Sequence, residues 1–137
     1  MSTSAPSRMS GAGRVLVLVY GILAMAATGR SLFQILTKFD EAPLAYTLSA
    51  LAAIVYIVAT VALIMPGDAW RTVAWVTISF ELVGVLVVGT LSITNPQLFG
   101  HPSVWSYYGI GYLLIPLVLP ILGLTWLYRR RVARVVA

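Results

Sequence analysis

The chain has 137 residues, of which 60% are hydrophobic and only 9% are charged. A soluble domain carries about 25% charged residues, so this composition excludes a water-exposed globule and indicates that lipid is the main solvent. The absence of cysteine excludes disulfides and thiolate metal sites, and a single histidine excludes a His-rich metal site, so no metal and no cofactor are expected.

The formal net charge is +5, but the basic residues do not form a nucleic-acid site. Arg129, Arg130, Arg131 and Arg134 gather in one tail behind an apolar segment. No aromatic side chains alternate with basic ones along a groove, and no nucleic-acid-binding motif is present. The positive-inside rule of membrane proteins accounts for this tail, so no nucleic-acid partner is expected.

The predicted elements begin with a small, polar tail over residues 1–13, which is typical of disorder. Four apolar segments follow, and each has the length of about 20–25 residues that crosses a hydrocarbon core of about 30 Å. Backbone groups in lipid must pair within their own segment, so these segments are predicted to be helices. They cover residues 15–36, 44–65, 73–93 and 104–128, within a membrane domain over 14–128, and residues 129–137 form a basic tail.

The first apolar segment has an alternative interpretation as a signal peptide. The stretch "RVLVLVYGILAMAATG" combines a basic flank, an apolar core and a small-residue site. However, the apolar pattern continues through "SLFQIL", and three more segments follow. These two observations favour a first membrane span.

Short links between the spans predict that successive helices are antiparallel neighbours. Arg8, Arg14, Arg71 and the basic tail would share one side of the membrane, and Lys38 would lie on the other. The positive-inside rule then predicts an all-α, antiparallel bundle of four transmembrane helices in the plasma (inner) membrane, with both termini in the cytoplasm. On this orientation, aromatic residues mark the two interfaces: Trp70, Trp75, Trp126 and Tyr128 the inner one, and Trp105, Tyr107 and Tyr108 the outer one.

Two charged residues, Arg30 and Glu81, fall inside predicted spans. Each costs about 2.5–3.5 kcal/mol at the centre of a membrane helix, which makes them candidates for a site. Helical spacing gives every span one stripe of small and polar residues, and such stripes face the bundle interior. The intramembrane candidates in these stripes are Glu81, Arg30, Gln34, Tyr20, Tyr46, Tyr56 and Thr77.

Several roles remain open for Glu81. A rise of about 1.5 Å per residue places Arg30 about 22 Å and Glu81 about 12–16 Å above the inner side, close enough for the arginine to bend inward and pair. Alternatively Arg30 reaches the outer interface near Asp40 and Glu41, and Glu81 hydrogen-bonds a tyrosine or threonine. Glu81 could also bind a proton or a cation, or contact another subunit.

Pro116 and Pro120 lie inside the fourth predicted span. Each removes a backbone hydrogen bond and can kink the helix, either as a tolerated irregularity or as a hinge beside Glu81. The only histidine, His101, falls in the link before this span and is expected to be a loop residue, with pH sensing as the alternative.

The stretches "AATGRSLFQILTKFDEAPLAYTLSALAAIVYIVATVAL", "AWRTVAWVTISFELVGVLVVGTLSI" and "LVLPILGLTWLYRRR" cover nearly the whole chain after the tail. Together they resemble a family of small four-helix integral membrane proteins of actinobacteria that has no assigned activity. The resemblance implies a membrane location and a four-helix architecture, and it supplies no catalytic or binding residue.

The sequence contains no nucleophile constellation, metal cluster or nucleotide-binding loop, and one loop histidine with one buried acid makes a poor catalytic set. We therefore expect a non-enzymatic accessory or assembly subunit of a membrane complex, with the lipid bilayer and other membrane subunits or further copies of itself as partners. The alternative is a small oligomeric transporter or channel that uses Glu81 as a proton or cation site.

Overall fold

The computed structural model of the chain describes residues 11–99 and 101–136, the side chains of 98 and 131–136 excepted. Most of the predicted disordered tail, residues 1–10, therefore lies outside the described residues. Residues 11–13 of that tail are already helical.

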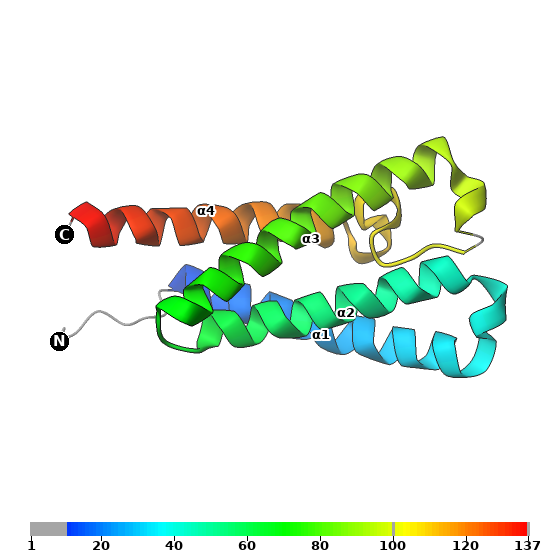
Figure 1. Cartoon of the computed structure of the whole chain (residues 1–137), viewed down its shortest axis with the longest axis horizontal. Coiled ribbons are helices and arrows are strands. Elements are labelled where there is room, and N and C mark those ends of the chain that lie inside the picture. Colours follow the sequence, from blue (N-terminus) through cyan, green and yellow to red (C-terminus); the bar gives the residue numbers. More distant parts are fainter. Residues whose placement is uncertain (1–10, 100, 137) are drawn as a thin grey trace.

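The described residues form helices and connecting links, without strands. Its four α-helices are α1 (Gly11–Lys38), α2 (Pro43–Ile64), α3 (Asp68–Thr94) and α4 (Ile115–Val136). Short 3-10 helices cover Phe39–Glu41, Pro96–Leu98, Ser106–Tyr108 and Ile110–Tyr112. In Figure 1, α1 begins, α2 turns into α3, and α4 ends at one end of the molecule, which we call the arginine end; the link between α1 and α2 lies at the opposite end.

Three helices are long and apolar enough to cross a membrane: α1 with its 3-10 extension to Glu41, α2 and α3. The segments Ser106–Tyr112 and Ile115–Arg130 pass the same test only when taken together, and they are bent by 98°. The three to four apolar helices indicate a multi-pass membrane protein. Pro43 occupies the first turn of α2, where its missing N–H costs no helical hydrogen bond.

The fourth apolar segment differs from the continuous helix predicted over 104–128. Residues 101–114, which we call the re-entrant segment, turn back toward the middle of the molecule, and α4 starts only at Ile115 (Figure 1). The helix then continues to Val136, so the predicted basic tail is helical as far as the structure describes it.

The break in the fourth segment has a distinct backbone geometry. Tyr107, Tyr108, Leu113 and Leu114 have φ between 53° and 62°, and Gly109 has φ 84°. Gly109 tolerates this left-handed conformation, and a Cβ atom there would lie 2.6 Å from the Pro116 ring. Pro116 sits in the first turn of α4, where it costs no hydrogen bond, so only Pro120 interrupts the helix interior.

The interior is built from the stripes that helical spacing predicts. Tyr20 on α1, Tyr56 on α2 and Glu81 on α3 are fully buried. Between α1 and α2 the contact surface is rich in alanine, which lets the two backbones approach closely. The buried alanines on these two helices are Ala24, Ala27, Ala45, Ala52, Ala53, Ala59 and Ala62.

Candidate functional site

Glu81 lies near the middle of α3 and has 0% of its surface exposed. The hydroxyl of Tyr20, on α1, donates a hydrogen bond of 2.7 Å to its Oε1 atom. The other carboxyl oxygen, Oε2, has no hydrogen-bond partner among the described residues. Glu81 is thus anchored through one oxygen and presents the second to the interior.

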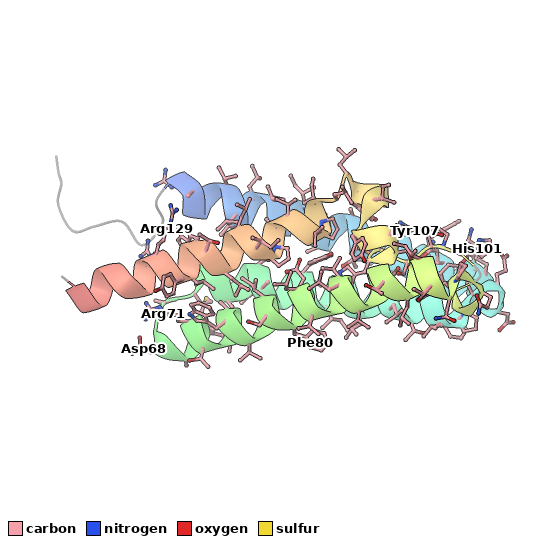
Figure 2. All side chains as sticks on the ribbon, turned by 90° about the horizontal axis from the view of Figure 1, so that it is seen from above. Asp68, Arg71, Phe80, His101, Tyr107 and Arg129 are labelled. Atoms are coloured by element: carbon pink, nitrogen blue, oxygen red, sulfur yellow. The ribbon has the colours of Figure 1, made fainter. Side chains whose placement is uncertain are left out.

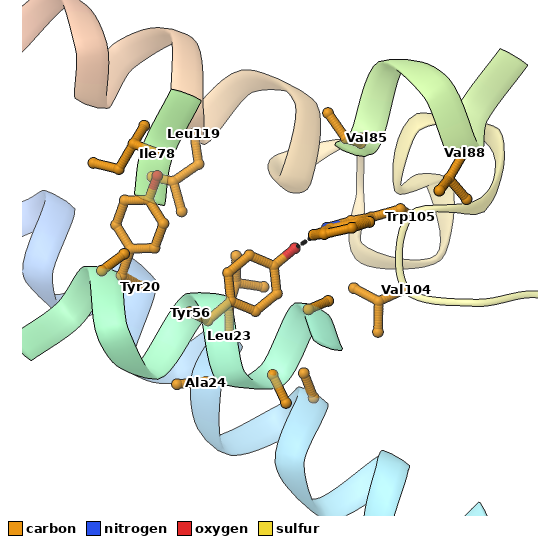
Figure 3. Close-up of a cluster of buried hydrophobic side chains, with 14 of the residues drawn as sticks. Tyr20, Leu23, Ala24, Tyr56, Ile78, Val85, Val88, Val104, Trp105 and Leu119 are labelled. Atoms are coloured by element: carbon orange, nitrogen blue, oxygen red, sulfur yellow. Dashed lines mark hydrogen bonds between the residues drawn. The ribbon is translucent and has the colours of Figure 1, made fainter. Parts of the chain in front are cut away.

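A second hydrogen bond joins α2 to the re-entrant segment next to this carboxyl. The indole Nε1 of Trp105 donates to the hydroxyl of Tyr56 at 2.9 Å (Figure 3). The Tyr56 and Tyr20 rings are tilted by 53° with centroids 6.3 Å apart. The two hydrogen bonds and the ring contact place Glu81, Tyr20, Tyr56 and Trp105 in one buried group, which we call the Glu81 cluster.

The re-entrant segment is fixed against α2 and α3. Ser49 of α2 accepts a hydrogen bond of 3.0 Å from the backbone N–H of Val104. Trp105 packs so closely on Gly84 of α3 that a Cβ atom at this glycine would lie 2.6 Å from the indole ring. The prediction that Trp105 marks the outer interface is wrong, because its side chain is only 2% exposed.

Arg30 is held by the re-entrant segment. Its Nη2 atom donates to the backbone carbonyl of Pro102 at 3.1 Å, and its guanidinium lies 5.9 Å from the centre of the Tyr112 ring. Within the described part of the chain Arg30 makes no ion pair with Glu81; the ion pair found there is Arg71–Asp68, and His101 lies close to Glu41. The structure therefore separates the two intramembrane charges and gives Glu81 a tyrosine partner instead.

His101 lies at the end of the re-entrant segment that is far from the arginine end (Figure 2), and we call this end, for its position in the fold alone, the outer end of the segment. Its ring stacks on Tyr46 with an interplanar angle of 8° and centroids 6.2 Å apart, and its Nε2 lies 3.4 Å from Oε1 of Glu41. A cavity of about 180 Å³ opens beside it. Residues from the end of α3, from the link that follows it and from the re-entrant segment line this cavity: Ser92, Pro96, Phe99, His101, Pro102, Ser106 and Tyr107.

No hydrogen bond joins the remaining predicted candidates Gln34, Thr77 and Tyr46 to the Glu81 cluster in the described residues, although Thr77 lies one helical turn from Glu81 on α3. Gln34 and Thr77 are half-buried, and the Oε1 atom of Gln34 has no partner among the described residues. Tyr46 belongs to the His101 contact at the outer end. In the residues that the structure covers, no group of three acidic, histidine or cysteine side chains could hold a metal ion.

Sequence reasoning identified Glu81, Tyr20 and Tyr56, and it did not identify Trp105. The one signal for this residue is Gly84, a small residue beside Glu81 on the polar stripe of α3, which leaves room for a large ring. Gly84 indicates that a large side chain can pack beside α3, but it does not indicate which residue does so. Comparison with known proteins found no matching family model, no matching curated protein and no matching solved structure.

Proposed function

We propose that this chain is a small membrane transporter or channel subunit in which Glu81 binds the transported proton or a small cation. The observation that carries the proposal is the second carboxyl oxygen of Glu81, which is buried at the centre of the helices without a hydrogen-bond partner among the described residues. A buried polar atom without a partner is costly, so a bound proton or cation would stabilise it.

The break in the fourth segment supports this proposal. Non-helical backbone at membrane depth is tolerated only where protein covers it or where it lines a cavity, and broken helices commonly form the ion sites of transporters. Here the re-entrant segment places Trp105 in the interior, where its indole is hydrogen-bonded to Tyr56 in the Glu81 cluster. The intramembrane acid and the broken span therefore meet at one place.

The cavity beside His101 supplies the outer approach to this place. It is lined by Ser106 and Tyr107, which directly follow Trp105 in the chain. A movement of the re-entrant segment would connect the cavity with the Glu81 cluster. In this proposal Trp105 closes the path, and Tyr20 orients the carboxyl.

The proposed setting is a bundle of four transmembrane helices in the plasma membrane, with the broken fourth segment counted as one span. The arginine end would face the cytoplasm, since Arg14, Arg71, Arg129 and Arg130 gather there and the opposite end has Lys38 outside the spans. No enzymatic chemistry is proposed, because the Glu81 cluster pairs a carboxyl with aromatic groups and contains no nucleophile–base pair.

The test uses the full chain in liposomes that contain a pH-sensitive dye, with a potassium diffusion potential as the driving force. Glu81→Gln should reduce proton flux to the level of empty liposomes, and Glu81→Asp should retain part of it. Asp40→Asn is the matched control, because it neutralises an exposed acid between α1 and α2. Flux of radioactive sodium in the same liposomes distinguishes a cation from a proton.

The proposal fails if the wild-type chain carries neither ion above the empty-liposome level, or if Glu81→Gln carries as much as wild type. Size-exclusion chromatography of each variant in detergent confirms that it is folded before flux is compared. Glu81→Gln keeps the size of the side chain and an oxygen that accepts from Tyr20, so we expect it to fold.

A second candidate function is that of a non-enzymatic accessory subunit of a membrane complex. Its supporting observation is the closed interior, since Glu81 is 0% and Trp105 only 2% exposed. In this case Glu81 and Tyr20 only fix the helix geometry. Native mass spectrometry of the protein extracted mildly from its own membrane separates the two: a complex with other chains supports the accessory function, and a homo-oligomer supports transport.

A further inference from the structure

The arginine end of the molecule contains a small cavity that the Glu81 cluster does not involve. It lies between the turn joining α2 to α3 and the second half of α4, and its volume is about 80 Å³. Buried apolar residues, among them Leu63, Ala74 and Leu127, form its inner wall. Liquid water takes up about 30 Å³ per molecule, so the cavity has room for a polar group the size of two or three waters.

Two arginines from different helices line this cavity, Arg71 on α3 and Arg130 on α4. The guanidinium of Arg130 stacks over the Trp126 ring at 4.9 Å, and Trp126 is itself part of the cavity wall. Stacking holds the plane of a guanidinium and leaves its N–H edge available to a ligand. The two helices thus present cationic groups to one cavity, which is open to the surroundings on one side.

The nearby acid does not neutralise this cavity. Arg71 forms an ion pair of 2.8 Å with Asp68, whose side chain is 84% exposed, so water screens the pair. Arg14 and Arg129 lie at the same end of the molecule, and Figure 2 shows Arg129 and Arg71 there. A single aspartate among these arginines leaves the end of the molecule strongly positive.

We infer that this cavity binds a phosphate group, and that an anionic phospholipid supplies it. Guanidinium groups match phosphate oxygens in pairs, and basic pockets between transmembrane helices bind the head groups of anionic lipids. Trp126 suits this depth, because tryptophan prefers the boundary between hydrocarbon and head groups. The inference is independent of the function proposed for Glu81.

The test is native mass spectrometry of the delipidated full chain, titrated with phosphatidylglycerol and, in parallel, with phosphatidylcholine. Arg130→Gln should weaken phosphatidylglycerol binding by more than about tenfold, the loss expected when a phosphate group loses one charge-assisted hydrogen-bonding partner. Arg129→Gln is the matched control: it removes the same charge from the neighbouring position, which does not line the cavity. We expect it to leave the affinity nearly unchanged, and neither variant should alter phosphatidylcholine binding.

Equal losses for Arg129→Gln and Arg130→Gln would overturn the inference, because they would show diffuse attraction and no site. Arg71→Lys provides a second variant, which keeps the positive charge and loses the planar guanidinium that binds two phosphate oxygens at once. It should weaken phosphatidylglycerol binding as well. Titration with inorganic phosphate distinguishes the two sources. If millimolar inorganic phosphate displaces phosphatidylglycerol, the inference of a lipid ligand is wrong and the cavity binds free phosphate.

Discussion

Two segments of nearly equal length and similar apolar character, 44–65 and 104–128, fold in different ways. The first becomes α2, a continuous helix over Pro43–Ile64. The second becomes a re-entrant segment followed by α4, with a bend of 98° between its halves. Hydropathy predicts that both belong in lipid, and it does not predict which of them remains one continuous helix.

The two segments also differ in how much the surrounding protein must cover their backbone. The break exposes backbone groups that lipid cannot satisfy, so protein must surround them. Ser49 accepts from the N–H of Val104, and Gly84 provides the space for Trp105. A broken span is thus stable here because two unbroken helices supply a polar partner and a gap of the right shape.

The largest expected effect comes from filling that gap. Gly84→Leu places a side chain where the Trp105 ring packs, and overpacking of this kind costs about 1–3 kcal/mol of the free energy of unfolding. Gly29→Leu is the matched control, since nothing lies within 4 Å of a Cβ atom at Gly29. It should change stability by less than about 0.5 kcal/mol.

Unfolding by SDS in mixed micelles measures both leucine variants. A Gly84→Leu protein as stable as Gly29→Leu would show that Trp105 does not occupy the space beside α3. The packing of Trp105 on Gly84 would then not explain why the broken span is stable.

The next effect concerns the partner of Glu81. A double-mutant cycle with Tyr20→Phe and Glu81→Leu, which removes the acceptor, should show a coupling of about 1–2 kcal/mol, the range for interhelical hydrogen bonds of model peptides in membranes. The same cycle with Arg30→Gln and Glu81→Leu should be additive within about 0.5 kcal/mol, because the two side chains share no contact. A larger coupling to Arg30 than to Tyr20 would contradict the observed geometry.

The smallest effect is expected at the outer end of the re-entrant segment. Arg30→Gln removes one exposed hydrogen bond to the carbonyl of Pro102 and should cost about 0.6 kcal/mol. Lys38→Gln removes a cation that does not touch the segment, and we expect no measurable change. Thermal unfolding followed by tryptophan fluorescence detects the difference, and equal midpoints would show that Arg30 does not hold the segment.

Much of the fold could be predicted from the sequence, because the dominant rules are local. The spans predicted over 15–36, 44–65 and 73–93 became helices over 11–38, 43–64 and 68–94. The first and third helices extend further at both ends, where residues outside the apolar core continue the helix, which hydropathy does not detect, and the second is shifted by one residue. The inward position of Tyr20, Tyr56 and Glu81 follows from the 3.6-residue period alone.

The site was predictable only as a set of candidates. Spacing places Tyr20, Tyr46, Tyr56 and Thr77 on inward faces, and it does not say which of them reaches Glu81. That choice depends on the relative height and rotation of α1 and α3, which are set by contacts along the whole length of the helices. From the sequence, Arg30 was an equally good partner for Glu81. In the structure its guanidinium donates instead to the backbone carbonyl of Pro102 in the re-entrant segment.

The sequence by itself determined that lipid is the solvent, that the chain is helical, and that one polar stripe of each of the first three helices faces inward. These follow from composition, from the need to pair backbone groups within a segment, and from helical periodicity. Only the tertiary structure decided that the fourth segment breaks, that Trp105 turns inward to Tyr56, and that Tyr20 holds Glu81. Each of these outcomes joins residues at least 49 positions apart or needs a gap that another helix provides, and no local pattern encodes such a distance.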